Sequence, residues 1–398
     1  MEEHFCILPW IHLHPRPDGR VTLCCVDHIN SVGSFQTHTL TEIANSDEMN
    51  LIRKKMMNNF PVKNCSQCSE REASGGVSYR INSNKKYDGL ITELRGQTTA
   101  SGQIQYPFKM LEMNIRYSNL CNFACRTCGG ENSSKWRQEN KEEISVINMS
   151  DTIPNYMEQV FEQLPHVRYI NFAGGESLLI HEHWEILDQL IKLGRENDVE
   201  ISYITNLSTL SYQKKNLLDY AQKFSKFTLV GSIDATHARA ELYRYGTRWK
   251  DIEKNLQSIR HSTVTFVINC TVGAMNIWHL PDMHRYLIDN NLLNSNSLKL
   301  TNLSFSPFLS SKILPASYKK EVTEKLNEHC RWLVERNIET KTWSDAIEFM
   351  NIEDNSHLLN QFIEYTDDLD HRRGENSAEV FPELHEILHS TSHLFTLK

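Results

Sequence analysis

From residue 109 onward, short apolar runs alternate with amphipathic segments along this chain. Six of the runs are candidate strands, at residues 109–117, 167–173, 199–206, 227–234, 263–272 and 297–305. Candidate helices lie between them, for example at 181–196, where apolar residues recur at helical spacing. This alternation is typical of β/α units around a parallel sheet. It predicts an α/β fold whose chemistry lies at the carboxyl ends of the strands.

Three cysteines, Cys121, Cys125 and Cys128, follow the first of these strands at gaps of three and two residues. One tight loop with this spacing can place three thiolates around one iron–sulfur cluster, and three protein ligands leave one iron open. The sequence has no fourth cysteine nearby, and no histidine between Asn114 and His166 to close a structural zinc site. Zinc binding and three reduced cysteines without a metal stay open as alternatives. The open iron favours a catalytic cluster.

The cysteine run resembles the CxxxCxxC signature of the radical S-adenosylmethionine (radical SAM) superfamily, which lies in the loop after the first barrel strand. The family usually has an aromatic residue before the third cysteine, where this chain has Thr127. The resemblance implies a partial (β/α)6 barrel of the TIM type. It also implies that the three cysteines are catalytic and bind a 4Fe-4S cluster, with S-adenosylmethionine as cofactor.

Further strand ends match the family's contacts to S-adenosylmethionine. After the second strand, Gly174, Gly175 and Glu176 resemble the GGE motif, which binds the amino group of the methionine moiety. Ser232 and Asp234 end the fourth strand, and alternate residues of a strand point to one side. They resemble the ribose motif of the family, although Ser and Asp are also common in caps and turns.

Three more contacts follow from the same resemblance. Arg244 is expected on the methionine carboxylate, with Arg248 as a substitute, because a guanidinium group can bind a carboxylate through two hydrogen bonds. Val272, on the fifth strand, is expected beside adenine. Asn206 ends the third strand and is either a ligand contact or only a turn residue.

A second cysteine set precedes the predicted barrel. The segment from Cys6 to Cys24 reads as a β-hairpin with its turn at residues 18–19, and Cys65 and Cys68 supply two more thiolates. Four cysteines can close a site, so structural zinc is one interpretation. The set resembles the twitch half of a SPASM domain, which holds an auxiliary 4Fe-4S cluster and generally follows the barrel. We favour Cys24 over its neighbour Cys25, because adjacent strand residues point to opposite faces.

The expected domains are a twitch-like auxiliary module at 1–81, a polar linker at 82–107, the barrel at 108–310 and a helical C-terminal region at 311–398. In the last region, residues 315–337 read as one amphipathic helix, and a second helix is expected to stop at Gly374. Asp370 and Arg372 resemble the tail of twitch-type proteins, and we assign them no chemistry.

Composition limits the cellular context. The 398 residues carry a formal net charge of -8, which argues against nucleic acid as the main partner. The sequence has no signal peptide and no run long enough to span a bilayer, so we expect a cytoplasmic protein without a membrane partner. Its ten cysteines then read as metal or redox ligands rather than as disulfides.

The resemblance therefore implies a radical SAM enzyme of the oxidoreductase or isomerase type. Reductive cleavage of S-adenosylmethionine yields a 5′-deoxyadenosyl radical that abstracts hydrogen from a substrate C–H bond. The auxiliary cluster carries an electron, and a flavodoxin- or ferredoxin-type protein is the expected reductant. We expect oxidation or epimerisation of a small sugar-like molecule, because no segment has room for a winged-helix domain that binds a leader peptide. Modification of a ribosomally made peptide, or a non-catalytic zinc or Fe-S binding protein, are the alternatives.

Overall fold

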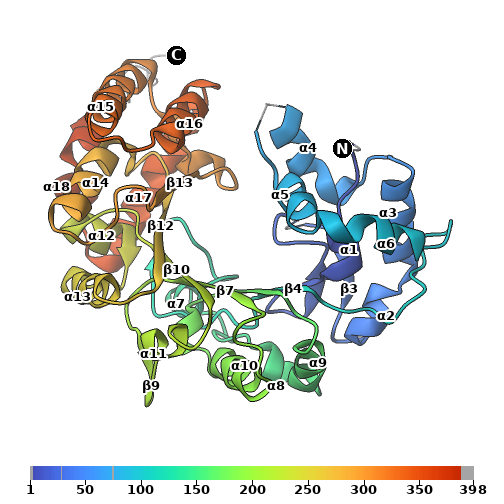
Figure 1. Ribbon diagram of the computed structural model, residues 1–398. Coiled ribbons are helices and arrows are strands. Elements are labelled where there is room, and N and C mark those ends of the chain that lie inside the picture. The colour runs from blue at the N-terminus through green and yellow to red at the C-terminus, as the bar shows by residue number, and fades with distance from the viewer. Residues whose placement is uncertain (1–2, 28, 74–75, 387–398) are drawn as a thin grey trace. The chain divides into compact units, whose positions relative to one another are not determined.

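The computed structural model describes residues 3–27, 29–73 and 76–386. The chain, drawn as a ribbon in Figure 1, divides into two compact units. Unit 1 comprises Met1–Cys121, Gly130–Tyr203 and Tyr220–Phe227, and unit 2 comprises Asn122–Gly129, Ile204–Asp219 and Thr228–Lys398. Each unit is therefore assembled from segments that are distant in sequence.

All six predicted strands are present. They are β4 (Glu112–Ile115), β6 (Tyr169–Phe172), β7 (Glu200–Thr205), β10 (Lys226–Ser232), β12 (Thr265–Val272) and β13 (Leu298–Asn302). They form one sheet in the order β13-β12-β10-β7-β6-β4, with β4 and β13 as its two edges within the described residues. The pairs β4–β6, β6–β7, β10–β12 and β12–β13 are parallel, as expected for β/α units. The α/β class and the open, partial-barrel form of the sheet are confirmed.

The two faces of the sheet differ in polarity. Phe172 of β6 and Tyr203 of β7 pack on His183 of α10 (His181–Lys192), with ring centroids 5.0 and 6.0 Å apart. The residues before them, Asn171 and Ser202, point to the opposite face and lie side by side in the strand register. Parallel sheets are usually apolar on both faces. A polar second face is therefore suited to polar ligands.

The N-terminal part of unit 1 contains a three-stranded antiparallel sheet, β1 (His14–Pro15), β2 (Arg20–Thr22) and β3 (Ser31–Ser34). The predicted turn is correct, and Gly19 adopts a φ of +82° there. The predicted start of the hairpin at Cys6 is wrong, because Leu8–Ile11 form helix α1. Pro9 favours a helix start, and the four residues are buried together rather than alternating. Three more helices follow: α2 (Leu40–Ala44), α3 (Asp47–Met57) and α4 (Ser66–Ala73).

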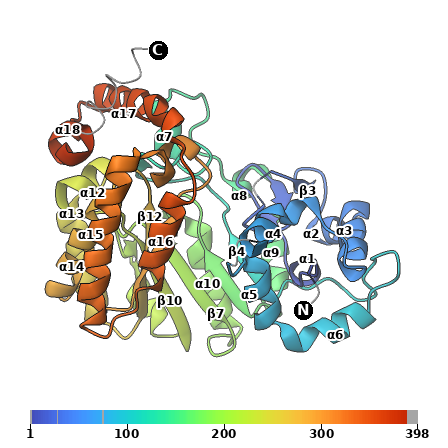
Figure 2. The same cartoon turned by 90° about the horizontal axis from the view of Figure 1, so that it is seen from above.

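Residues 82–107, expected as a linker, are largely helical. They contain the end of α5 (Tyr79–Lys86) and all of α6 (Asp88–Gly96), and Figure 2 places both helices beside α1. Buried Asn84 of α5 accepts a hydrogen bond from the Ile7 amide at 2.8 Å and donates one to the Phe5 carbonyl at 2.8 Å. The polar composition of this segment predicts a linker. The partners that bury Asn84 lie almost 80 residues away, so the local sequence does not indicate them.

The C-terminal region of unit 2 is helical, as predicted. Its helices are α15 (Ala316–Val334), α16 (Lys341–Asn351), α17 (Leu359–Arg373) and α18 (Ser377–Val380). Gly374 ends α17 with a φ of +63°, which confirms the predicted stop. Among the described residues, no helix is both long and apolar enough to cross a membrane.

The remaining elements connect these parts. They are α7 (Ser134–Glu139), α8 (Met149–Thr152), α9 (Tyr156–Gln163), α11 (Leu217–Ala221), α12 (His237–Tyr243), α13 (Trp249–Arg260), α14 (Leu280–Asp289), β5 (Ala124–Cys125), β8 (Ser211–Tyr212), β9 (Lys215–Asn216), β11 (Arg244–Tyr245) and the 3-10 helices at Lys63–Cys65, Ser177–Leu179, Ile277–His279, Pro307–Leu309, Ser311–Ile313 and Ser356–Leu358.

Candidate functional site

The loop that bears the three spaced cysteines is held by short backbone pairings. In unit 2, β5 pairs antiparallel with β11, which puts Cys125 opposite Arg244. The amide of Cys128 donates to the carbonyl of Cys125 at 3.0 Å and closes the turn between them. Cys121 belongs to unit 1, where its amide donates to Oγ of Ser134 at 3.1 Å. The thiols therefore sit on an ordered backbone.

Cys125 lies in a site that suits a bound metal centre. Burial raises the pKa of its thiol to about 12, although the nearby Arg244 guanidinium lowers it. Nη1 of Arg244 lies 3.7 Å from the Cys125 sulfur. A buried thiol of this kind becomes a thiolate when a metal takes up the charge, with the arginine as an additional counter-charge. The donor chemistry of this site fits an iron–sulfur cluster.

Arg244 is also paired with Asp234, its fellow candidate. Nε of Arg244 donates to Oδ2 of Asp234 at 2.8 Å, and the amide of Thr271 donates to Oδ1 at 2.6 Å. The Asp234 side chain is fully buried. The structure thus joins two predicted ligand contacts to each other, and Asp234 serves here to orient Arg244. Ser232, the last residue of β10, is half-buried.

Two further predicted contacts to S-adenosylmethionine, Arg248 and Val272, differ in how exposed they are. Arg248 is 84% exposed and pairs with Asp251 at 2.7 Å. Val272 is fully buried at the end of β12, where its carbonyl accepts from the Leu303 amide at 2.9 Å. Unit 2 also has a small cavity, lined by Thr127, Tyr243, Met275, Phe362 and other residues.

The glycine pair of unit 1 packs against the backbone that leads into Cys121. A Cβ on Gly175 would lie 2.2 Å from the carbonyl oxygen of Leu120, and Gly174 has a φ of +106°. The amide of Glu176 donates to that same Leu120 oxygen at 2.7 Å. The Glu176 carboxylate is buried and accepts from the Leu178 amide at 3.1 Å. These residues support the cysteine loop in addition to any ligand contact.

Asn206 has a similar supporting position in unit 2. Its amide group donates to Oδ1 of Asn122 at 2.9 Å and its oxygen accepts from the Ser208 amide at 2.9 Å. Asn122 in turn donates to the Ser208 hydroxyl at 3.0 Å. The turn after β7 is thereby tied to the residue that follows Cys121.

The structure gathers the N-terminal cysteines in unit 1. Cys6 interacts electrostatically with Cys65 and Cys68, and Cys24 interacts with Cys25 and, less strongly, with Cys6. Burial is the main reason why the pKa of Cys65 rises to about 12, with Cys68 as the next cause. Cys6, Cys24 and Cys68 are buried and Cys65 is half-buried. A closed site of four thiolates fits this arrangement.

Cys25 acts on the pKa of Cys24 more strongly than Cys6 does, and it has further neighbours of its own. Burial raises its pKa, the Arg116 guanidinium lowers it, and Glu112 and Tyr79 are its other neighbours. Glu112 begins β4, Arg116 follows the end of that strand, and Tyr79 begins α5. The ten cysteines, all within the described residues, form no disulfide. In the same part of the chain, no group of three or more His, Cys, Asp or Glu is arranged to hold a single metal ion.

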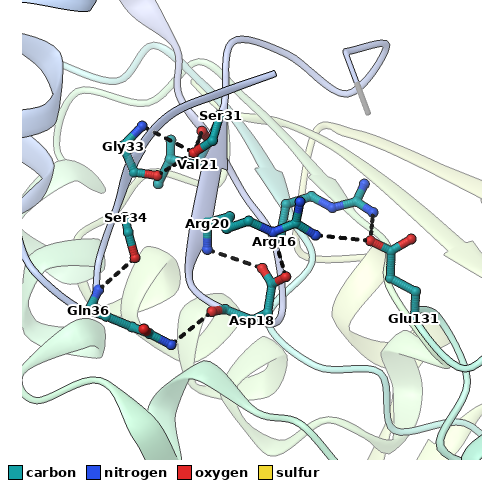
Figure 3. A network of polar contacts seen from close by, with 9 residues as sticks. All are labelled: Arg16, Asp18, Arg20, Val21, Ser31, Gly33, Ser34, Gln36 and Glu131. Atoms are coloured by element: carbon teal, nitrogen blue, oxygen red, sulfur yellow. Dashed lines mark hydrogen bonds and ion pairs between the residues drawn. The ribbon is translucent and has the colours of Figure 1, made fainter. Parts of the chain in front are cut away.

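A polar network fixes the hairpin that carries Cys24 (Figure 3). The Asp18 carboxylate accepts from the amide and from Nε of Arg20, at 3.1 and 2.6 Å. Buried Arg16 donates to Glu131, three residues after Cys128, at 2.6 Å. Sequence reasoning did not identify either arginine, because neither belongs to a spaced motif.

Arg126 and Arg80 were missed for the same reason. Arg126, between Cys125 and Cys128, is buried and forms ion pairs with Asp370 and Glu375. Arg80 is buried beside the N-terminal cysteines and pairs with Glu72. Burial of a charged residue next to a group of thiols indicates a functional role, and the structure is needed to show that burial.

Comparison with known families matches two parts of the chain. Residues 115–287 match the model described as the radical SAM superfamily, and residues 6–69 match SPASM, described as an iron-sulfur cluster-binding domain. One curated relative is an S-adenosylmethionine-dependent nucleotide dehydratase from Fibrobacter sp., which is 30% identical over 113 residues. The match covers 26% of this chain and 29% of that protein, so it spans under a third of the relative.

Two solved structures resemble parts of the fold. AdoMet-bound anSMEcpe is 18% identical, with 56% of this chain and 60% of that chain covered and a TM-score of 0.41. Streptococcus suis SuiB, bound to its precursor peptide SuiA, is 12% identical, with 83% and 70% covered and a TM-score of 0.36. Likeness at these scores does not bear on the substrate of the present chain.

Proposed function

Since the chain belongs to the radical SAM superfamily and carries a SPASM-type iron–sulfur module, we propose that it catalyses hydrogen abstraction from a small, polar, sugar-like substrate. The predicted cofactors, a 4Fe-4S cluster with S-adenosylmethionine and an auxiliary cluster, are those of the two matched families. The module precedes the radical SAM domain in sequence, as expected. Oxidation or epimerisation is the reaction that we propose, with a flavodoxin- or ferredoxin-type reductant.

Cys121, Cys125 and Cys128 hold the catalytic cluster in this proposal. When bound, the cluster supplies the electron that cleaves S-adenosylmethionine to methionine and a 5′-deoxyadenosyl radical. The supporting observation is the setting of Cys125, which is buried and has Arg244 Nη1 at 3.7 Å from its sulfur. A fixed positive group beside a developing thiolate lowers the electrostatic cost of the buried charge.

The predicted S-adenosylmethionine contacts keep their proposed roles with one refinement. Ser232 is half-buried at a strand end and suits a ribose hydroxyl. Gly174, Gly175, Glu176 and Asn206 are proposed to contact the ligand as well as to support the cysteine loop. Asp234, which is already engaged by Arg244 and Thr271, acts by orienting Arg244. Val272 forms the apolar floor near adenine.

Cys6, Cys24, Cys65 and Cys68 are proposed to hold the auxiliary cluster. Four protein ligands leave no iron open, so this cluster suits electron transfer rather than substrate binding. The buried Arg80, whose charge acts on Cys6 and Cys65, provides a local counter-charge for thiolates. Its ion pair with Glu72 holds it in place.

The polar face of the sheet supports a small hydroxyl-bearing substrate. In unit 1, Tyr79 donates to the buried Glu112 carboxylate, and Asn171 donates to Asn114 at 2.9 Å. In unit 2, Thr301 donates to Asn269 at 2.8 Å. Hydroxyl, amide and carboxyl groups of this kind recognise a sugar by hydrogen bonds. The curated relative's name, a nucleotide dehydratase, also denotes action on a small sugar-containing molecule.

The test is anaerobic reconstitution of the full chain and of the variant in which Cys121, Cys125 and Cys128 are replaced by Ala. We expect about eight irons in the wild type, about half of that in the variant, and no detectable reductive cleavage of S-adenosylmethionine by the variant. Bound iron and 5′-deoxyadenosine are the two measurements.

Cys330→Ala is the matched control, because Cys330 is a half-buried cysteine on α15 that belongs to neither set. Its iron content and cleavage rate should equal those of the wild type. Cleavage at the wild-type rate in the triple variant, or a colourless protein that binds only zinc, would refute the proposed function.

A further inference from the structure

The backbone of the cysteine loop in unit 2 is anchored through one arginine. The amide of Arg126 donates to the Tyr243 carbonyl at 2.9 Å, next to the β5–β11 pairing. Nε of Arg126 donates to the Leu242 carbonyl at 3.2 Å. Arg126 stands between two proposed cluster ligands, so any motion of this residue moves Cys125 and Cys128.

The same arginine is held from the opposite end of the sequence. Nη2 of Arg126 forms ion pairs with Asp370, the residue 244 positions away on α17, and with Glu375 at 2.8 Å. The hydroxyl of Tyr365, also on α17, donates to the Arg126 carbonyl at 2.7 Å. We name the three residues Tyr365, Asp370 and Glu375 the C-terminal brace.

The brace is itself rigidly built. Asp370 Oδ2 accepts from the Ser377 amide at 2.7 Å, which fixes the carboxylate at the end of α17. The Arg126 side chain is 3% exposed, and those of Asp370 and Glu375 are 16% and 15% exposed. Arg373 of α17 also lies over the ring of Tyr245 on β11, at 4.5 Å. Buried, charge-assisted bonds of this geometry are among the strongest that a side chain makes.

We propose that the C-terminal brace, acting through Arg126, positions Cys125 and Cys128 for their cluster. This assigns a role to α17 and the residues just after it, and makes Arg126 a positioning residue. The inference rests on the proposed function only in that it treats these two cysteines as ligands. If the only role of these ion pairs were to pack α17, an apolar contact could replace them at no loss of stability. Two carboxylates on one guanidinium therefore indicate a positioning role.

The experiment compares the full-length wild type with the variant Asp370→Ala/Glu375→Ala. In the metal-free chain, alkylation of each cysteine by a maleimide is followed by mass spectrometry. We expect Cys125 to react at least about ten-fold faster in the variant, because a hydrogen bond to a charged group contributes more than a factor of ten to an equilibrium. In the reconstituted protein, iron should pass to a chelator faster by a similar factor.

Cys270 is an internal reporter of global unfolding, since it is fully buried on β12 of the same unit. Its reaction rate should not change. Faster alkylation of Cys270 to the same extent as Cys125 would mean general destabilisation and would overturn the inference. An unchanged rate at Cys125 would overturn it too.

Two further variants sharpen the result. Tyr365→Phe removes only the hydrogen bond to the Arg126 carbonyl, and should give a smaller acceleration confined to Cys125 and Cys128. Asp368→Ala is the matched control, because Asp368 pairs with Arg372 at 3.0 Å and is 60% exposed on the same helix. The alkylation assay needs no cluster, so failure of the proposed function would leave this test intact.

Discussion

At the scale of single residues, Asp234 shows how a buried carboxylate stabilises a buried cation. It accepts from Arg244 and from the Thr271 amide, and the carbonyl of the same residue accepts from Asn276 at 3.0 Å. Burial lowers the pKa of Arg244, but Asp234 and Cys125 raise it further, so the net shift is upward. The guanidinium therefore stays charged beside the cysteine loop.

Replacing Asp234 by Ala should leave the Arg244 charge buried without its carboxylate. Removal of one partner from a buried pair typically costs about 3–5 kcal/mol of the free energy of unfolding. Urea unfolding of the metal-free protein would measure this loss. Asp251→Ala, which breaks the exposed pair with Arg248, should cost under about 1 kcal/mol. Equal losses in the two variants would contradict the assigned role.

Sequence spacing identified the cysteines but not the groups that hold them. Cys121, Cys125 and Cys128 stand out because one cluster requires its ligands close together on the chain. The brace on Arg126 comes from a helix about 240 residues away, and no local pattern connects the two. Whether an exposed-looking Arg or Asp is buried depends on tertiary packing, which sequence periodicity does not report. The ligand roles of the strand-end residues remain predictions.

At the scale of elements, α14 and α15 of unit 2 meet through a pair of histidines. Nδ1 of His284 and Nε2 of His329 are 3.1 Å apart, and the ring of Trp343 packs on both. Burial lowers the pKa of His284 to about 4, and burial together with His284 and Arg285 lowers that of His329 to about 3. Both imidazoles are therefore neutral in the folded protein near neutral pH.

The pair predicts a loss of stability in mild acid. Between the ordinary histidine pKa of 6.5 and the folded value of about 4, the unfolded chain binds protons that the folded protein excludes. Stability thus rises with pH across this window and falls as the pH is lowered from 7 to 5. For His284 alone the loss is about 2 kcal/mol.

Urea midpoints at pH 7 and pH 5 would measure this dependence. The variant His284→Gln/His329→Gln should show a smaller difference between the two midpoints than the wild type. His181→Gln is the control, because His181 is 54% exposed beside Glu185 and should leave the difference unchanged. A variant with the full wild-type difference would exclude this pair as the cause.

The strands were predictable because each is a short apolar run between amphipathic helices. The hydrophobic pattern alone indicates this alternation of strands and helices along the chain. Helix α1 and the helices of 79–96 were not. Four buried residues in a row give no period by which a strand differs from a helix, and the polar surface of α5 reads as a linker. Only the contacts of Asn84 with residues 5–7 explain why that segment is ordered.

At the scale of the whole molecule, the chain contains two sets of thiols that are distant in sequence, and Cys25 lies next to the proposed ligand Cys24. Cys24 interacts with Cys25 and, less strongly, with Cys6, and Cys25 also lies beside Arg116 and Glu112. The neighbouring positions therefore offer a matched pair of substitutions. They are adjacent in sequence, and each has charged neighbours that the other lacks.

Cys24→Ala should lower the iron content of the reconstituted full chain by up to about half and leave reductive cleavage of S-adenosylmethionine in place. Cys25→Ala should retain all of the iron. Iron analysis and 5′-deoxyadenosine formation are the measurements. If Cys25→Ala loses the iron and Cys24→Ala keeps it, the ligand assignment must be exchanged.

Gly175 limits which substitutions the protein can accept at this position. A single base substitution turns a glycine codon into one for alanine, serine or another larger residue, and every such residue brings a Cβ to within 2.2 Å of the Leu120 oxygen. Because that contact is with backbone, no side-chain rearrangement relieves it. In a library of all single substitutions, position 175 should tolerate replacement as poorly as the cysteines, although its side chain has no reactive atom.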